Sequence, residues 1–400
     1  MRRKGCDEGI TRRRFAGVLG TLCAGAALGV MPGCGGGSAE TAADGPKGSP
    51  ETAEPSGRPV DAPTASSADG PADAVEAAFP AGAVCVAEYA GNTLAVIDPA
   101  SWQVVQRISA GQNPATALWA AGSVYVGSSG GGELAVVPVE NPSAALHIPV
   151  GTQPLGLCYD HARGLLYVGD YFSNCIHEVD VALNSLVGTI KLDVCGYHKR
   201  TDPPDCCRIG PGEGRRTVAM ALAPEDDVLY CANYGTYDVA RIDLEKGCEI
   251  EAFDGVVGPR QMVVSHDGTL LYLAGVGGED EQQVNALYVV DRATGKRVRE
   301  VPVGLSVAGV AQSPDGATVY ALTRDEGVLV AFDANTWKEE RRCDVGAGAD
   351  TLFLDGEGAR LYVANSATGV LAAVDPQAFE EVGRVEGLSS PKGIAVVEET

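Results

Sequence analysis

The sequence is poor in positive charge and in histidine. It holds 30 Lys and Arg against 53 Asp and Glu, a formal net charge of −23, and only 5 His in 400 residues. A protein that tracks a nucleic-acid backbone needs clustered Lys and Arg to displace counterions. We therefore expect no nucleic-acid partner, and the small number of histidines argues against a multi-histidine copper centre.

Short motifs of several enzyme classes are also missing. The sequence has no CxxCH for covalent haem, no HExxH for a zinc protease and no glycine-rich P-loop for phosphates. Such motifs bring metal ligands or phosphate-binding amides together at a fixed spacing. Their absence predicts a protein without catalytic residues and without a bound cofactor.

Residues 1–33 are predicted to form an export signal. The stretch TRRRFAG, Thr11–Gly17, precedes a weakly apolar run of Gly and Ala that ends at PGCGGGS. Arg12 and Arg13 resemble the pair of a twin-arginine signal peptide, and Cys34 resembles the lipidated cysteine of a lipoprotein, although the residues before it depart from the usual lipobox. The alternatives are a cleaved signal with Cys34 merely nearby, or an uncleaved anchor. Each places the protein outside the cytoplasm, at the outer face of the membrane or in the cell envelope.

Residues 34–78 are predicted to be a disordered tether. They consist mostly of Gly, Ser, Pro, Ala, Asp and Glu, and they show no periodic apolar pattern. Such a composition buries too little apolar surface to offset the entropy of ordering the chain. The tether would hold the folded part away from a membrane, which it would contact through the lipid anchor only.

Residues 79–400 contain one phrase that recurs seven times. Clear copies are LYVGDYFSNCIHEVD, LYCANYGTYDVARID and LYVANSATGVLAAVD, and the unit repeats about every 42 residues. Each unit reads as four short strands separated by Gly and Asp turns, and the Asp that ends the third strand reads as a turn former. The first unit lacks its own first strand, while the chain ends on an extra one, PKGIAVV. The prediction is an all-β, seven-bladed β-propeller of four-stranded antiparallel blades, in which Gly393–Val397 closes the ring.

The repeat resembles the YVTN-type β-propeller family. The resemblance rests on YVAN at Tyr362–Asn365 and YCAN at Tyr230–Asn233, within the repeated unit. It implies an exported or surface-attached binding protein. Related seven-bladed rings include lactonases and the heavy chains of amine dehydrogenases, so the resemblance leaves function open.

Two insertions predict which face of the ring carries function. The larger, at 195–216, falls where the fourth strand of blade 3 leads to the first strand of blade 4. A smaller one lies between the second and third strands of blade 5. Connections of these two kinds meet at the same mouth of the central channel, so we expect this face to bind the ligand.

The polar residues that flank the strands at this mouth are the candidate ligand-binding groups. Arg and Lys mixed with carboxylates could hold a small polar or anionic ligand. The alternative is that these groups are solvated or cap strands. The candidates are Asn113, Gln153, Arg216, Arg260, Lys392, Asp170, Asn233, Arg324 and Asn365, with Glu88 and Asp350 at equivalent positions.

The larger insertion carries the segment CGYHKRTDPPDCC, Cys195–Cys207. Together with Cys175 its cysteines form an even set of four, Cys175, Cys195, Cys206 and Cys207, and disulfide staples are expected in an oxidising compartment. Zinc or another divalent ion on Cys195, His198, Cys206 and Cys207 is the alternative, but adjacent cysteines suit a tetrahedral centre poorly. A redox-active pair of Cys206 with Cys207 is a third reading.

The sequence thus predicts a membrane-tethered, monomeric propeller outside the cytoplasm that binds a partner protein or a small polar ligand without catalysis. The alternative is a lactonase-like hydrolase or an accessory subunit of an exported redox enzyme. A structural envelope protein is a third possibility. The identity of the ligand stays open.

Overall fold

The computed structural model describes residues 23–24, 77–192, 214–223, 225, 227–254, 256–276 and 286–398. The predicted signal with Arg12 and Arg13, and the predicted tether with Cys34, lie outside the described residues except for Cys23–Ala24 and residues 77–78. The export signal and the tether therefore stay predictions. No helix among the described residues is long and apolar enough to cross a membrane.

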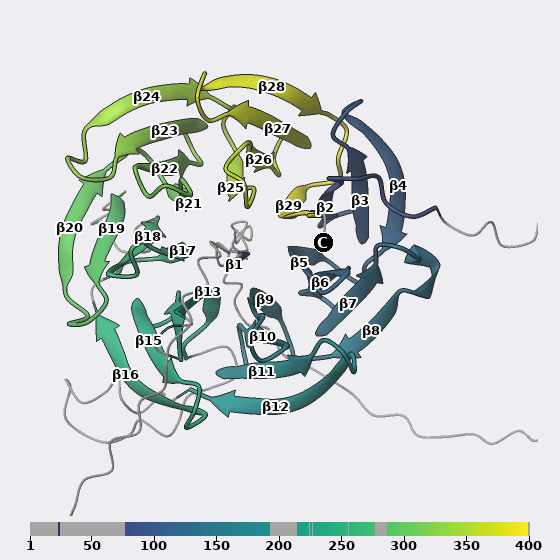
Figure 1. Cartoon of the computed structure of the whole chain (residues 1–400), viewed down its shortest axis with the longest axis horizontal. Helices are drawn as coiled ribbons and strands as arrows, with labels where there is room; N and C mark the ends of the chain where they lie inside the picture. The colour runs from purple at the N-terminus through teal and green to yellow at the C-terminus, as the bar shows by residue number, and fades with distance from the viewer. Residues whose placement is uncertain are drawn as a thin grey trace, which may run out of the picture. The chain divides into compact units, whose positions relative to one another are not determined.

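Seven antiparallel sheets of four strands stand around a central axis, which confirms the predicted all-β, seven-bladed propeller (Figure 1). In blades 1 to 7 the innermost strands are β29 (Pro391–Val396), β5 (Pro114–Ala120), β9 (Pro154–Asp160), β13 (Thr217–Ala223), β17 (Pro259–Val264), β21 (Val307–Gln312) and β25 (Ala349–Leu354). The second strands are β2 (Val84–Glu88), β6 (Ser123–Ser128), β10 (Leu165–Asp170), β14 (Val228–Asn233), β18 (Leu270–Gly275), β22 (Thr318–Thr323) and β26 (Leu361–Asn365).

The outer half of each blade continues the same order. The third strands are β3 (Thr93–Asp98), β7 (Glu133–Pro138), β11 (Cys175–Asp180), β15 (Asp238–Asp243), β19 (Ala286–Asp291), β23 (Val328–Asp333) and β27 (Val370–Asp375). The outermost strands are β4 (Gln103–Ser109), β8 (Leu146–Pro149), β12 (Ser185–Lys191), β16 (Cys248–Asp254), β20 (Arg297–Pro302), β24 (Glu339–Asp344) and β28 (Glu380–Val385). A short 3-10 helix, η1 (Pro142–Ala144), precedes β8, and a two-residue strand, β1 (Cys23–Ala24), pairs with the inner edge of β9.

The ring closes through the last strand of the chain. β29 pairs antiparallel with β2, with Val84 opposite Val396 and Cys85 opposite Ala395. Blade 1 is therefore built from both ends of the propeller sequence, as the missing first strand and the extra last strand predicted. Closure gives blade 1 its fourth strand and joins the two ends of the propeller sequence in one blade.

The core lies between neighbouring blades. All five residues of β2 are buried, whereas in the outermost strand of the same blade, β4, exposed residues alternate with partly buried ones and only Ile108 is buried. The inner strands are covered on both faces, which is why they read as unbroken runs of Val, Ala, Leu and Tyr. Burial also raises the pKa of Cys85, so this thiol behaves as a small apolar side chain.

The Asp residues that end the third strands form turns, as predicted. In each of six blades the carboxylate accepts backbone N–H bonds from the residues that follow, as Asp333 does from Thr336 at 2.7 Å. The other five are Asp98, Asp180, Asp243, Asp291 and Asp375. This bonding satisfies the backbone of the turn to the outer strand, so these carboxylates are structural.

Candidate functional site

One rim of the channel is formed where the innermost strands begin and the second strands end. The residue after the second strand donates its N–H to the residue near the start of the innermost strand, as in Tyr171 to Gln153 at 2.9 Å and Tyr234 to Arg216 at 3.0 Å. Ser129 makes the same bond to Asn113 at 3.0 Å. The repeat thus brings the predicted mouth residues to equivalent places around one rim.

Asp170 ties its own blade together. It is fully buried, and its carboxylate accepts the N–H and the hydroxyl of Thr152 at 2.8 and 2.7 Å and the N–H of Gln153 at 2.9 Å. His177 Nε2 lies 3.7 Å from Oδ2. Burial raises the pKa of Asp170, but His177 and the bonds from Thr152 outweigh burial and hold this pKa well below the usual Asp value. The hydrogen-bonding capacity of this carboxylate is therefore used within its own blade.

Three further residues at the ends of second strands have the same role. Glu88 accepts the hydroxyl of Thr93 at 2.7 Å, Arg107 Nε at 2.8 Å and the N–H of Ser389 at 2.9 Å. Asn233 donates to Asp238 at 2.8 Å. Asn365 donates to the carbonyls of residues 346 and 347. We call Glu88, Asp170, Asn233 and Asn365 the bracket residues, because each joins loops of its own blade at the rim.

Two other candidates contribute mainly through the backbone. Asn113 has a positive φ of 52° and accepts the N–H and the hydroxyl of Ser129 at its carbonyl, while its side chain donates to the Tyr89 carbonyl at 3.2 Å. Gln153 uses its N–H and its carbonyl to join Asp170 and Tyr171. These groups shape the rim, which agrees with the strand-capping alternative.

Four charged residues form a second kind of group, which we call the charge cluster: Arg260, Arg324, Asp350 and Lys392. Arg260, Asp350 and Lys392 are buried, and they come from β17, β25 and β29, while Arg324 follows β22. All three cations act electrostatically on the Asp350 carboxylate. The cluster is thus assembled across blades 5, 6, 7 and 1.

Burial shifts the pKa of both Asp350 and Lys392 toward the neutral form, and the neighbouring charges modify these shifts. Burial raises the pKa of Asp350, and Lys392, Ser366 and the two arginines offset only part of that rise. Burial lowers the pKa of Lys392, and Arg260 and Arg324 lower it further, while Asp350 opposes them. Each group is therefore shifted toward its neutral form, as expected where like charges are gathered in a partly dry site.

Tyrosines accompany the cations at the rim. The Lys392 ammonium lies 4.7 Å from the centroid of Tyr89, the Arg216 guanidinium 5.7 Å from that of Tyr171, and the Arg260 guanidinium 5.1 Å from that of Tyr234. Such cation–π contacts orient the cation over the ring face. The sequence reading missed these tyrosines. The signal was the Tyr that follows the bracket residue in EY, DY and NY at 88–89, 170–171 and 233–234.

Arg215, at the end of the larger insertion, was also missed. Its side chain is fully buried and pairs with Asp238 and Glu249, and its N–H donates to Asn174 Oδ1 at 2.7 Å. Asn174 also accepts the N–H of Leu192 through its carbonyl, at 2.9 Å. The described residues on either side of the insertion are therefore held at the same loop of blade 3, while residues 193–213 lie outside the described residues and the position of the insertion stays a prediction.

The predicted cysteine set is described only in part. Cys195, His198, Cys206 and Cys207 lie outside the described residues, so the disulfide and the metal alternative stay predictions. Cys175 is a partly buried free thiol whose Sγ lies 3.3 Å from the Ser173 carbonyl. Within the described ranges no group of three or more His, Cys, Asp or Glu is arranged to hold a metal ion.

The string GSSGG at 127–131 matches the G-x-S-x-G pattern of hydrolase nucleophiles, and the sequence reading passed over it. It lies between β6 and β7, and the Ser129 hydroxyl donates to the Asn113 carbonyl at 2.8 Å. A nucleophile elbow needs a strand followed by a helix. Here a strand follows, so the serine is a turn residue.

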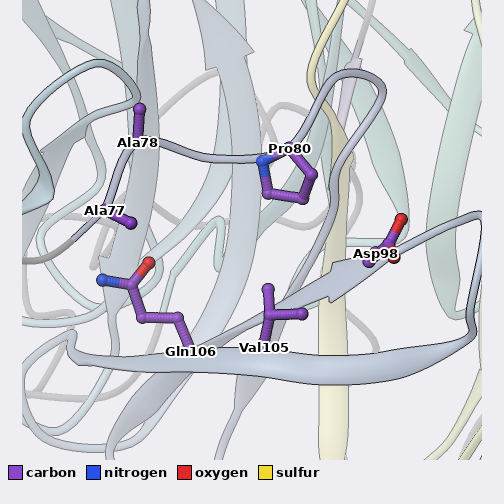
Figure 2. A pocket seen from close by; sticks show the side chains of 6 residues that line it. All are labelled: Ala77, Ala78, Pro80, Asp98, Val105 and Gln106. Atoms are coloured by element: carbon purple, nitrogen blue, oxygen red, sulfur yellow. The ribbon is translucent and has the colours of Figure 1, made fainter.

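A pocket of about 360 Å³ lies away from the rim (Figure 2). It is formed by residues 77, 78 and 80 before the first blade and by Val105 and Gln106 of β4, with Asp98 at its edge. Asp98 ends β3, at the opposite end of that strand from the rim. With one charged residue, which already binds its own turn, this pocket offers no convergent set of ligand-binding groups.

Comparisons with known proteins agree on the fold. No protein-family profile matches the chain, and no curated protein matches it by sequence. Solved structures do match. The chain is similar to hydrazine synthase from Kuenenia stuttgartiensis, at 16% identity and a TM-score of 0.62, over 75% of this chain and 93% of that one.

Two further structures carry different names. One is a putative 6-phosphogluconolactonase from Bacteroides fragilis, at 15% identity and a TM-score of 0.62, over 79% of this chain and 98% of that one. The other is a dihydro-heme d1 dehydrogenase, at 15% identity and a TM-score of 0.54, over 80% of this chain and 66% of that one. At such low identity these likenesses establish one thing about the chain, its seven-bladed β-propeller fold.

Proposed function

We propose that this propeller is a non-catalytic binding protein that holds a small anionic ligand at the rim of its channel. The observation that carries the proposal is the charge cluster, in which Arg260, Arg324 and Lys392 act electrostatically on the buried carboxylate of Asp350. A local excess of positive charge is notable in a chain with a net charge of −23. Arginine forks and a lysine ammonium are the groups that proteins use to hold carboxylates and phosphates.

The bracket residues support the same reading by elimination. Their oxygens and amides are used inside their blades, so they build a rigid rim and leave ligand contacts to the charge cluster. The tyrosine rings beside Lys392 and Arg260 give the site an aromatic wall. A rigid scaffold with a few convergent charged groups is typical of small-ligand sites.

Export fits this function, and we propose it as well. If residues 1–33 are removed as a signal, β1 leaves with them, and the edge of β9 that it pairs with would face an open channel. Lipidation of Cys34 would then attach the protein to a membrane through the tether. The mass of the mature N-terminus, measured on protein from the cell envelope, tests this: a lipid-modified Cys34 supports it, and an intact Met1 contradicts it.

The test of the binding function is isothermal titration calorimetry of the full chain with a panel of small anions. Arg324→Gln is expected to weaken binding at least tenfold, because it removes one cation of three. Arg342→Gln is the matched control, since Arg342 pairs with Glu339 on the outer strand β24, away from the rim. Equal affinity in both variants would contradict the proposed site.

A hydrolytic or redox-accessory role is the second candidate. Its support is the fold shared with proteins that are named as a lactonase, a synthase and a dehydrogenase. Asp350 is the carboxylate at the rim that could serve as a general base, because its raised pKa brings it nearer to neutral pH. Turnover of a lactone by the full chain, abolished by Asp350→Asn, would favour this role over binding alone.

A further inference from the structure

We propose that two copies of this chain associate through β12, the outermost strand of blade 3, across a two-fold axis. The strand lies on the perimeter of the ring, and among the described strands it pairs with β11 alone (Figure 1). Its outer edge therefore presents N–H and C=O groups to which a strand of another molecule can bind. The inference goes beyond the proposed anion site and does not depend on it. It would replace the monomer expected from the sequence.

The outermost strands of six blades share one irregularity, a β-bulge that inserts one extra residue. In β12 the register moves from Glu178 opposite Gly188 to Val179 opposite Leu186, so Val187 is the extra residue. In five of these strands the extra residue is an exposed Val or Ile: Val105 in β4, Val187 in β12, Ile250 in β16, Val298 in β20 and Val382 in β28. An exposed apolar residue at the bulge is thus a property of the repeat and marks no site by itself.

The residues that flank the bulge set β12 apart. In four other blades exposed charged residues flank it: Glu251 in β16, Arg297 and Arg299 in β20, Glu339 in β24, and Glu381 in β28. Such charges oppose pairing with another chain, because pairing would remove them from water. In β12 the flanking residues are Leu186 and Gly188, and Lys191 is the one charged residue of the strand. Leu186, Val187 and the preceding Leu183 are 44%, 52% and 69% exposed.

Two other outermost strands carry little charge, but each is protected in another way. The strand β8 has only four residues and ends at Pro149, which has no N–H to donate. Along β4, residues 77, 78 and 80 lie beside Val105 and Gln106, where they form the pocket of Figure 2. Within the part of the chain that the structure describes, the edge of β12 has neither protection.

A second copy of this chain is the partner that fits the edge of β12. A charged partner surface would lose hydration against Leu183, Leu186 and Val187 without gaining an opposite charge. A chain of net charge −23 also repels its own copies, so they associate best where the contact has no negative charge. The strand β12 has none, and a two-fold axis places the same uncharged strand on both sides of the contact.

One carboxylate lies beside this strand. Glu178 of β11 packs over Gly188, and burial raises the pKa of its side chain. A carboxyl group whose pKa is raised is more easily neutralised, so Glu178 opposes the contact less than an exposed carboxylate would. The glycine at 188 is the residue that leaves room for this side chain, because a Cβ there would meet the Glu178 carboxylate.

The contact should be weak, and salt should strengthen it. One short strand from each copy buries less than the area of about 1,200 Å² at which standard stable interfaces begin. Repulsion between the copies is screened by salt, since the Debye length falls from about 10 Å at 0.1 M to about 3 Å at 1 M. Binding of a basic partner would instead weaken as salt increases, so the sign of the salt effect separates the two kinds of occupant.

The experiment is sedimentation velocity of the full chain between about 1 and about 100 μM, in NaCl of about 0.1 M and about 1 M. We expect the sedimentation coefficient to rise with concentration toward that of a dimer, and to rise at lower concentration in the higher salt. Val187→Lys should weaken association about tenfold. This variant lowers the net negative charge, so its effect cannot come from increased repulsion between the copies.

Val298→Lys is the matched control. It makes the same change at the equivalent bulge position of β20, where the valine is 58% exposed, and it should leave association unchanged. Urea unfolding of both variants establishes that they are folded, and Leu186→Lys should repeat the effect of Val187→Lys. A chain that stays monomeric in both salts, or association that both valine variants weaken equally or that neither weakens, would overturn the inference. So would a monomer that binds phosphatidylcholine vesicles through Val187, because the patch would then contact lipid.

Discussion

The bracket residues and the charge cluster share one rim, but they differ in where their partners come from. Asp170 receives its hydrogen bonds from Thr152 and Gln153 of the connection into its own blade. Asp350 instead faces cations contributed by other blades. Asp170 ends a second strand and Asp350 lies near the start of an innermost strand, so carboxylates at the same rim have different roles. Groups saturated within one blade build the scaffold, and we propose that the charges gathered from several blades bind a ligand.

The largest effect on stability should come from a substitution in the scaffold, at Arg215. Because this guanidinium is fully buried between Asp238 and Glu249, Arg215→Ala leaves two buried carboxylates without their cation. We expect a loss of about 3–5 kcal/mol in the free energy of unfolding, measured with urea. Arg216→Ala, which removes a more exposed neighbour, should cost less than about 1 kcal/mol. Similar losses in the two variants would refute the assigned role of Arg215.

Asp170→Asn should produce the next largest loss, about 1–3 kcal/mol at neutral pH, because it weakens several bonds to a buried carboxylate. The pKa of Asp170 is lowered in the folded state, so its contribution is present above the usual Asp pKa and is lost as the pH falls through the folded value. Unfolding curves of the variant should therefore depend less on pH below about pH 4. An identical acid dependence in both proteins would contradict the bracket role.

Arg324→Gln should weaken ligand binding and leave stability almost unchanged, which is the opposite of what we expect for the scaffold variants. Anion affinity should fall about tenfold, equivalent to about 1.4 kcal/mol. The free energy of unfolding should change by less than about 0.5 kcal/mol, because its backbone bond to Ser306 is kept. Paired calorimetry and urea titration separate the two quantities. A large loss of stability with unchanged affinity would place Arg324 with the scaffold.

The smallest effect is expected at Tyr234, whose ring faces the Arg260 guanidinium at 5.1 Å. Tyr234→Leu removes the aromatic face and should weaken anion binding about threefold, in line with a cation–π contact of about 0.5–1 kcal/mol. Tyr234→Phe keeps that face and should bind as the parent protein does. If phenylalanine and leucine weaken binding equally, the hydroxyl rather than the ring is responsible.

The fold was readable from the sequence because its signals are local and repeated seven times. Strand alternation, Asp turns and the extra strand at 391–397 all predicted a closed ring of four-stranded blades. The rim positions were also readable, since they follow from the repeat. Their division into bracket residues and charge cluster was not, because it depends on which side chains meet across blades far apart in sequence, such as Arg260 and Lys392.

The role of Arg215 could not be predicted from the sequence for the same reason. Its partners Asp238 and Glu249 lie 23 and 34 residues later, and no spacing rule connects them. The tyrosines at 89, 171 and 234 were within reach, since they recur at one position of the repeat. A tyrosine in a strand repeat is also an ordinary core residue, so the repeat alone does not mark these rings as partners of cations.

Ring closure by β29 has a consequence for the order in which the site is made. Lys392 lies on the propeller strand that is synthesised last, so the charge cluster lacks one of its cations until β29 has emerged and joined β2. A ligand that requires Lys392 binds only the closed ring, and its binding energy then opposes the detachment of β29. The bound anion would therefore stabilise the pairing of β29 with β2, where the two ends of the propeller sequence meet.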